Sequence, residues 1–337
     1  MNLKGLKELL SSKKKILIAQ ADNPDGDSVA SALALEQILY DMGNEPLLYC
    51  AIDIPKHLRH LPGWDRIDQE IPTNFEATII VDCSSKSLFE IAEKSGELSW
   101  ILSKPVIIID HHDVSPTLDA TITCNDIKAV STGEVVYKIA QELNWPLSIE
   151  AKNMIAVSIL SDSLGLMTES TTAQSIHIIA ELVESGVKLA ELEETRRQTM
   201  KKSIELTRYK GELLQRIQYS SDDRIATIVI PWEEIEKYSS QFNPSILVLD
   251  DMRLTDNVQI AIAFKTYNNN RITAKIRSNY GFPIANKLAE HFGGGGHQYA
   301  SGFKVNTTDY NQIISECIEY TKKLLDQRKE KTSDETV

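Results

Sequence analysis

Short apolar runs alternate with amphipathic segments along the first half of the chain. Strands are expected at 15–19, 46–50, 77–82, 105–110 and 120–124, because each run is too short for an ordinary helix. Helices are expected at 3–12, 28–41, 131–143, 148–161 and 172–185. This alternation predicts an α/β fold with a mostly parallel sheet whose two faces are both covered.

The pattern changes after residue 187. Residues 188–218 are charged and helical in character, and Glu193 and Arg197 have the i,i+4 spacing of a solvated helix. We interpret this stretch as a helical linker; the alternative is that its basic residues face a substrate. Beyond it, strands are expected at 225–230, 257–266, 271–277 and 303–305, and helices at 231–240, 282–291 and 309–327.

The sequence therefore predicts two domains. An N-terminal domain would span 1–187, the helical linker 188–218, and a smaller α/β C-terminal domain 219–327. Residues 257–277 are expected to form a β-hairpin around the polar turn at 268–270. Residues 328–337 are expected to be a polar tail.

Acidic and imidazole side chains follow the expected strands. Ligands of parallel sheets gather beyond the carboxyl ends of the strands, so these side chains are expected to share one rim. They are Asp25, Asp27, Asp82, Asp110, His111, His112 and, from the end of a helix, Asp162. A simpler explanation exists for the first two, since Asp-Gly is good turn chemistry and Asp27 could cap the following helix.

Such a cluster of negative charge would be unfavourable unless cations neutralised it. Carboxylates together with imidazole suit Mn²⁺, and Mg²⁺, Co²⁺ or Zn²⁺ are alternatives. A central carboxylate such as Asp82 could bridge two ions about 3.5–4 Å apart, an arrangement that serves phosphoryl displacement. The rim is therefore a candidate metal centre.

A second candidate site is the glycine-rich segment Gly293–His297. It could be a flexible linker, but such linkers rarely lie between a helix and a strand of one domain. Gly294, Gly295 and Gly296 could instead offer bare backbone N–H groups to an anion, with His297 as a further donor. Arg277 and Ser278 end a preceding strand, and the guanidinium could bind a phosphate or carboxylate.

Bulk properties narrow the class of protein. The formal net charge of −12 argues against broad coating of DNA, which requires a basic face. The four cysteines are scattered and indicate neither a zinc site nor a disulfide framework. No signal-peptide pattern and no apolar run of about 18 residues occur, so we expect a soluble, cytoplasmic protein without a membrane partner.

These motifs resemble those of the DHH phosphoesterases that carry a DHH-associated C-terminal domain. Asp25-Gly-Asp27 resembles the first family motif, Asp82 the second, Asp110-His111-His112 the third and Asp162 the fourth. Gly293–His297, with Ala300 and Gly302, resembles the signature of the associated domain. The resemblance covers nearly the whole chain, and the length is similar to that of the nanoRNase/pAp phosphatase group.

The resemblance implies hydrolysis of short oligonucleotides (nanoRNA, linear dinucleotides) to nucleoside monophosphates, of pAp to AMP and phosphate, or of both. It implies two Mn²⁺ ions, the first held by Asp25 and Asp82. The ligands of the second would be Asp27, Asp82, His111 and Asp162. Asp110 would orient a neighbouring group, and His112 would contact phosphate or protonate the leaving group.

In the associated domain, the resemblance implies that Arg277, Gly294–Gly296 and His297 hold the terminal phosphate of the substrate. Ser278 joins this predicted substrate-binding set, and a homodimer is left open.

One position departs from the family pattern. The first motif of the family has a histidine four residues before its first aspartate, and Ala21 stands there in this chain. The first ion would then be bound weakly, or with Asp22 or water in place of the histidine. The alternatives are a non-catalytic nucleotide-binding protein with a decayed metal site, and a RecJ-like exonuclease that acts on longer single strands.

Overall fold

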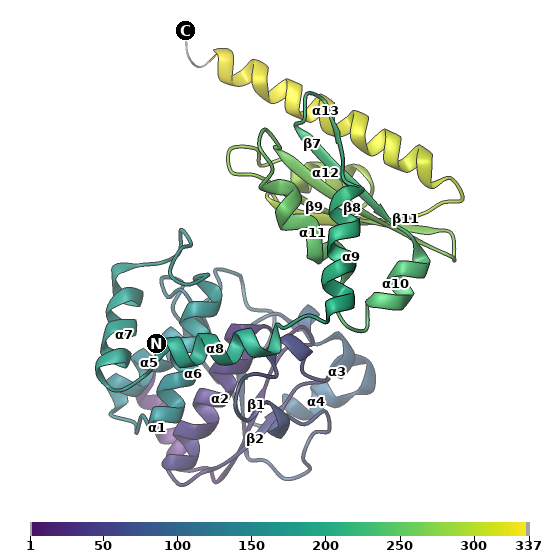
Figure 1. Cartoon of the computed structure of the whole chain (residues 1–337). Helices are drawn as coiled ribbons and strands as arrows, with labels where there is room; N and C mark the ends of the chain where they lie inside the picture. Colours follow the sequence, from purple (N-terminus) through teal and green to yellow (C-terminus); the bar gives the residue numbers. More distant parts are fainter. Residues whose placement is uncertain (1, 335–337) are drawn as a thin grey trace. The chain divides into compact units, whose positions relative to one another are not determined.

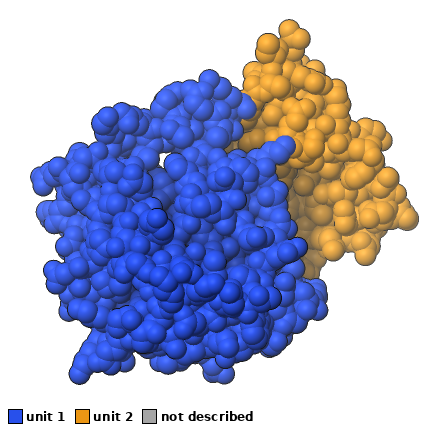
Figure 2. All heavy atoms as spheres, turned by 90° about the horizontal axis from the view of Figure 1, so that it is seen from below, with its two compact units in different colours: residues 1–201 blue, residues 202–337 orange. Residues whose placement is uncertain are grey.

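The computed structural model describes residues 2–334. The chain forms two compact units that divide between Lys201 and Lys202, coloured separately in Figure 2. Each unit has its own β-sheet and its own apolar clusters. The predicted α/β fold, with a parallel sheet in the N-terminal part and a second sheet in the C-terminal part, is confirmed.

Unit 1 contains a parallel sheet in the order β2-β1-β3-β4-β5. Its strands are β1 (Lys15–Ala19), β2 (Glu45–Tyr49), β3 (Ala77–Val81), β4 (Val106–Asp110) and β5 (Ile122–Asn125). The central strands β3 and β4 are buried along their whole length, as expected of strands that are covered on both faces. All five strands agree with the predicted runs to within two residues.

Helices cover both faces of this sheet (Figure 1). Alternate strand residues such as Ile107 and Ile109 pack against one set of helices, and Ile108 packs on the opposite side. The first set is α1 (Leu3–Ser11), α2 (Gly26–Asp41), α5 (Thr132–Leu143), α6 (Ile149–Asp162) and α7 (Ala173–Glu184). The other face carries α3 (Glu90–Ser95) and α4 (Glu97–Ile101), which the sequence pattern did not reveal.

Unit 2 contains a mixed sheet in the order β10-β11-β9-β8-β7-β6. Its strands are β6 (Gln218–Ser220), β7 (Ile225–Ile230), β8 (Ile260–Tyr267), β9 (Arg271–Ser278), β10 (Gly295–His297) and β11 (Ala300–Asn306). Strands β8 and β9 form the predicted antiparallel hairpin. Its helices are α9 (Ile204–Gln215), α10 (Trp232–Tyr238), α11 (Pro244–Arg253), α12 (Ala285–His291) and α13 (Tyr310–Asp334).

Two predictions need correction. The stretch predicted as one linker is two helices: α8 (Leu189–Thr199) packs in unit 1, and α9 packs in the core of unit 2 through Leu206 and Leu213. The predicted polar tail is helical as far as Asp334, and its last residues lie outside the described part. Among the described residues, none of the helices combines the length and apolar character that a bilayer span requires.

Candidate metal centre

The predicted rim exists in unit 1, at the carboxyl ends of three neighbouring strands. The segment after β1 leads to Asp25 and Asp27 at the start of α2, Asp82 follows β3, and β4 ends at Asp110. Helix α6 packs along α2 and supplies Asp162 from its last turn. Residues up to 137 positions apart in the sequence therefore meet at one place, as the strand-end argument predicted.

His111 lies at the centre of this cluster. Its Nε2 atom is 3.5 Å from Asp27 Oδ2, 3.5 Å from Asp82 Oδ1 and 3.5 Å from Asp162 Oδ2. Ligand atoms that each lie about 2.1 Å from a common ion are about 3.0 to 3.5 Å from one another. Each of these three distances suits two ligands of one cation, and the ligand atoms of Asp27, His111 and Asp162 all lie within 4.8 Å of one another.

The hydrogen bonds of His111 support this assignment. Its Nδ1 lies 3.3 Å from the carbonyl oxygen of Ala129, which can only accept, so Nδ1 carries the proton. Its Nε2 is buried and has no hydrogen-bond partner among the described residues. A ring that donates through one nitrogen and leaves the other lone pair free is oriented as metal-ligating histidines are. The residues present fit a divalent cation at this position.

The carboxylate of Asp27 is fixed by a set of donors that sequence reasoning missed. It is fully buried and accepts hydrogen bonds from Ser158 Oγ at 2.5 Å, Thr132 N at 2.7 Å and Ser31 Oγ at 2.9 Å. Asp27 does not cap α2 as the alternative explanation required, because the N-cap is Asp25, which accepts from Ser28 N at 3.0 Å.

Asp82 is held in an unusual backbone conformation. Its φ of 59° is in the left-handed region, which non-glycine residues rarely adopt and which often marks functional sites. Its Oδ1 accepts a hydrogen bond from Thr132 Oγ1 at 2.9 Å. Thr132 thus orients Asp82 with its hydroxyl and Asp27 with its backbone N–H.

The carboxylates repel one another when no cation is present. Burial, followed by the charges of Asp27 and Asp25, raises the pKa of Asp82 well above its usual value. The same causes, in the same order, raise the pKa of Asp162 from 3.8 to about 7. Carboxylates that are this difficult to ionise without a counter-charge form a favourable site for a cation.

We therefore predict that the metal-free protein loses stability as the pH rises. Unfolded Asp162 has the ordinary pKa of 3.8 and folded Asp162 one of about 7, so only the folded state retains this proton in between. The contribution of protonated Asp162 to the free energy of unfolding is fully present below pH 3.8. It is lost as the pH rises through the folded-state pKa of about 7. A one-unit difference in pKa between folded and unfolded protein corresponds to about 1.4 kcal/mol, so a loss of a few kcal/mol is expected.

Urea unfolding in EDTA at pH 5 and pH 8 measures this difference. Asp162→Asn is the control, because it removes this titrating group and should reduce the pH dependence, while Asp82 and His112, whose pKa values are also raised, still titrate. Saturating Mn²⁺ should also remove the loss at pH 8. Equal stability of the metal-free protein at both pH values would contradict the prediction.

Asp110 and His112 form a pair beside the cluster. Asp110 Oδ1 accepts hydrogen bonds from His112 Nδ1 at 2.8 Å and from the backbone N–H of His111 at 2.8 Å. Burial alone would raise the pKa of Asp110, but the hydrogen bonds from His112 lower it below its usual value. The bond to Asp110, together with the charge of Asp82, raises the pKa of His112. His112 is half exposed and can therefore present a protonated ring to an anion.

The first of the two expected ion positions is less complete. Among the described residues, the two groups whose ligand atoms lie within 4.8 Å of one another are Asp27-His111-Asp162 and Asp82-His111-His112. Asp25 belongs to neither, and one of its oxygens caps α2. Ala21 is buried, and Asp22 Oδ2 accepts from Ile91 N at 2.6 Å, which turns this carboxylate toward α3. Among the described residues, the two groups share His111, and neither includes Asp25, Ala21 or Asp22.

Unit 2 holds the predicted substrate-binding residues. Arg277 and Ser278 end β9, and Ser278 Oγ is buried without a hydrogen-bond partner among the described residues. Gly295, Gly296 and His297 form β10, which pairs with β11. The glycine-rich segment therefore runs into a β-hairpin formed by β10 and β11.

The prediction that the backbone N–H of Gly294 is free to bind an anion is wrong. Its N–H donates to the carbonyl of Ala289 at 2.8 Å and is not free for an anion. A Cβ at Gly294 would lie 2.3 Å from the carbonyl oxygen of Gly302, and Gly296 has a φ of 131°. These glycines are required at least partly by the tight packing of the hairpin.

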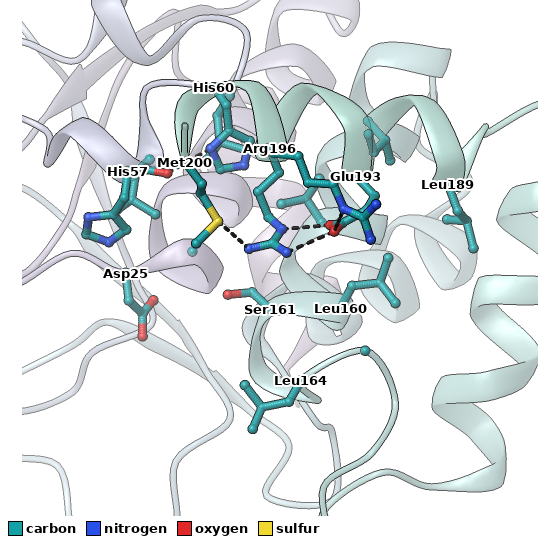
Figure 3. Close-up of a pocket in the computed structure, with 17 residues that line it drawn as sticks. Asp25, His57, His60, Leu160, Ser161, Leu164, Leu189, Glu193, Arg196 and Met200 are labelled. Atoms are coloured by element: carbon teal, nitrogen blue, oxygen red, sulfur yellow. Dashed lines mark hydrogen bonds and ion pairs between the residues drawn. The ribbon is translucent and has the colours of Figure 1, made fainter. Parts of the chain in front are cut away.

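A cavity of about 850 Å³ lies in unit 1 beside Asp25 (Figure 3). Its lining is largely apolar and includes Leu160, Leu164 and Leu189. Arg196 projects into it and is held by two bonds to Glu193, at 2.7 and 2.9 Å. The lining also includes His57 and His60, which match no ligand spacing in the sequence. This volume lies within the range of small-molecule sites.

Comparison with known protein families gives two matches. Residues 15–168 match the model described as "DHH family, N-terminal domain", and residues 243–323 match the "DHHA1 domain". The first match contains all the residues of the rim, and the second contains Arg277 and the glycine-rich segment.

Similar proteins extend over most of the chain. A "bifunctional oligoribonuclease and PAP phosphatase NrnA" from Thermus thermophilus is 27% identical over 90% of this chain and 88% of its own length. The protein of the same name from Bacillus subtilis is 22% identical over 87% and 90%. The crystal structure of an exopolyphosphatase-related protein from Bacteroides fragilis has a TM-score of 0.82 at 22% identity and covers 96% of this chain and 97% of its own.

Proposed function

We propose that the chain, in which a DHH N-terminal domain and a DHHA1 domain are present, is a phosphoesterase that hydrolyses short oligonucleotides and pAp. Products would be nucleoside monophosphates from the former, and AMP and phosphate from the latter. We assign hydrolysis to residues 1–187 and substrate binding to residues 219–327. Curated relatives with these two activities, similar over most of their length, support the substrate class.

The observation that carries the proposal is the free Nε2 of His111 among three carboxylates at equal distance. The ion held there, for which we propose Mn²⁺, would neutralise the cluster and polarise a phosphoryl oxygen. Asp27, Asp82, His111 and Asp162 would hold it. Thr132 and Ser158 fix the orientation of the carboxylates.

His112 is placed to act on the substrate directly. Its Nδ1–H is bonded to Asp110, so its Nε2 is the atom that can face a phosphate. The raised pKa keeps the ring protonated to higher pH, and a protonated ring can bind the phosphate and give its proton to the leaving oxygen. Asp110 positions the ring and stabilises its charge.

The second unit would bind the rest of the nucleotide. Arg277 offers a guanidinium fork and His297 an exposed imidazole to a terminal phosphate. The hydroxyl of Ser278, predicted from the sequence to join them, is buried on the opposite face of β9. Beside the metal centre, the cavity next to Asp25 provides apolar surface and Arg196, which suits a base and its sugar.

The test is to incubate the purified chain with Mn²⁺ and a labelled dinucleotide, and separately with pAp. Monophosphate products that disappear in the Asp82→Ala variant support the proposal. Tight binding of both ligands without turnover at saturating metal would identify a nucleotide-binding protein instead. Rapid degradation of long single strands, with little activity on dinucleotides, would favour the RecJ-like alternative.

A further prediction concerns the number of bound ions. Because Ala21 cannot ligate and Asp25 lies outside both ligand groups, the wild-type chain should bind one Mn²⁺ tightly. Ala21→His should add a second ion and raise turnover. Calorimetric titration with Mn²⁺ measures both affinities, and Ala21→Leu is the control for bulk without a lone pair. Two equal sites in the wild type, or no change in Ala21→His, would contradict this.

A further inference from the structure

One face of the sheet in unit 2 carries cations on three adjacent strands. Residues directly opposite each other on paired strands point to the same face. The register of β8, β9 and β11 therefore places five cations on one face. One is Arg271, whose guanidinium lies over the ring of Tyr267. The other four are here called the cationic strip: Lys265, Lys275, Arg277 and Lys304. His297 lies on the same face, because it pairs with Ala300, which pairs with Arg277.

This face is only partly covered by helices. Ala261 and Ala263 of β8 are buried in the apolar cluster to which α9, α10 and α11 contribute. Farther along the sheet Lys275 and Arg277 are half-buried, while Lys304 and His297 are exposed. The neighbours of Lys275 across the strands are Ala263 and Gly302. No side chain longer than a methyl group flanks Lys275 on these two strands.

The cations of the strip have no carboxylate partner. Among the described residues, no ion pair joins Lys265, Lys275, Arg277 or Lys304 to an acidic side chain. Burial, and then the charges of Lys265 and Arg277, lower the pKa of Lys275. Like charges are thus brought together in a chain whose net charge is −12. A bound anion would relieve this repulsion.

Protection of a sheet edge does not explain the strip. Lysines on exposed edge strands often prevent these strands from pairing with another chain and aggregating. Here β11, β9 and β8 each have a neighbour on both sides, because β10 closes one end of the sheet and β7 and β6 the other. Lys265 and Lys275 therefore stand on interior strands, where this reason does not apply, whereas Lys304 lies beyond the part of β11 that β10 pairs with.

The spacing within the strip suits a chain of phosphates. Arg277, Lys275 and Thr273 are alternate residues of β9, so their side chains leave the sheet about 6.8 Å apart along the strand. Thr273 is flanked by Lys265 and Lys304 on the neighbouring strands. The sheet thus offers a cation at each of three successive positions along β9. The spacing between these positions is comparable to that between successive phosphates of an extended single strand.

We propose that the cationic strip binds consecutive phosphodiester groups of an oligonucleotide, with Lys275 contacting the phosphate that follows the one held by Arg277 and His297. This inference rests on the proposed function and deepens it, because it separates the two substrate classes. A pentanucleotide has phosphates for all three steps. The single nucleotide pAp has one phosphate to be hydrolysed and only one other, for which Arg277 and His297 suffice.

The experiment compares the full-length wild type with Lys275→Gln. Binding of a fluorescein-labelled RNA pentanucleotide is measured by anisotropy in EDTA at several salt concentrations, and KM and kcat for the pentanucleotide and for pAp are measured with Mn²⁺. Lys287→Gln is the matched control, because Lys287 is an exposed lysine of α12, which packs against the opposite face.

The dissociation constant and the KM for the pentanucleotide should rise about tenfold in Lys275→Gln, from the loss of one charge-assisted contact. The slope of log affinity against log salt should fall in magnitude by about 0.7. The kcat values and the KM for pAp should not change, and Lys287→Gln should behave as wild type. Lys265→Gln should give a smaller effect in the same direction.

Unchanged pentanucleotide affinity and salt slope in a folded Lys275→Gln variant would overturn the proposal, as would an equal rise in KM for pAp. Tighter binding of inorganic tripolyphosphate than of the pentanucleotide would overturn the assignment to a nucleotide. If the wild type hydrolysed neither substrate, the proposed function would fail, while the binding comparison in EDTA would still decide the role of the strip.

Discussion

Replacing His111 with alanine is expected to abolish hydrolysis while the fold is retained. Nε2 of His111 is the one atom that lies 3.5 Å from each of three carboxylates, so its loss removes the ligand that the whole group shares. The loss of groups that merely orient ligands costs about 10- to 100-fold in metal affinity or activity. The loss of the shared ligand should therefore cost at least about a hundredfold.

The fold should tolerate this change. The side chain of His111 gives up one hydrogen bond, to the carbonyl of Ala129, and a ring contact with His112 at 4.4 Å between centroids. His177→Ala is the matched control, since His177 is exposed on α7. Saturating Mn²⁺ should raise the melting temperature of wild type and His177→Ala, but not that of His111→Ala. Full activity or a full Mn²⁺-induced shift in His111→Ala would contradict the assignment of the centre.

The position of the metal centre could be predicted because two general rules act on a simple pattern. Five short apolar runs alternate with helices, which gives a parallel sheet, and the carboxyl ends of its strands share one edge. Asp82, Asp110 and His111 follow directly from those rules. Asp162 was less certain from position alone, because it ends a helix, and it joins the others since α6 packs closely along α2.

The roles of Asp25 and Asp27 could not be separated from the sequence. Both begin α2, but the N-cap position places one outside the first turn and the other inside it. The distinction depends on donors that are remote in the chain: Thr132 and Ser158 are 105 and 131 residues from Asp27. The Ser131-Thr132-Gly133 segment at the start of a helix was a usable signal for these donors.

For the glycine-rich segment, the sequence revealed a structural constraint but not its cause. Four consecutive glycines indicate that another group lies close to the backbone, but they do not show whether that group is a ligand or another part of the chain. Here part of the answer is the chain itself, because the carbonyl of Gly302 occupies the space that a side chain at Gly294 would need. The cationic strip was likewise invisible, because Lys265, Lys275 and Lys304 share a face only once the strand register is known.

Replacing Gly133 with alanine is expected to destabilise unit 1 and to weaken metal binding together. Gly133 lies in the first turn of α5 against α6, and an added Cβ would be 2.1 Å from Ser158 Oγ and 2.5 Å from Ser158 Cβ. Either the new methyl group or the side chain of Ser158 must therefore move. Overpacking of this kind costs about 1–3 kcal/mol.

The displacement of Ser158 adds a second cost. Its hydroxyl lies 2.5 Å from the buried carboxylate of Asp27 and also accepts the N–H of Gly133 at 2.9 Å. Hydrogen bonds to charged groups contribute about 1.5–3 kcal/mol. The free energy of unfolding should therefore fall by about 2.5–6 kcal/mol, the sum of both costs. Because Asp27 loses a donor that fixes it, Mn²⁺ affinity should fall as well.

Gly211→Ala separates this steric effect from the general effect of adding a methyl group to a helix. Gly211 lies within α9, and nothing lies within 4 Å of a Cβ built there. That variant should be stabilised by about 0.5–1 kcal/mol, because alanine favours the helix over glycine. Urea unfolding in EDTA measures both variants, and a Mn²⁺ titration measures the metal site.

A double variant tests the contact itself. Ser158→Gly removes the atoms that would collide with the new methyl group, so Gly133→Ala combined with Ser158→Gly should be less destabilised than the sum of the single variants. Mn²⁺ affinity should stay low in the double variant, because the hydroxyl that bonds Asp27 remains absent. If Gly133→Ala kept wild-type stability, the close packing of α5 on α6 would not be what holds Asp27 in place.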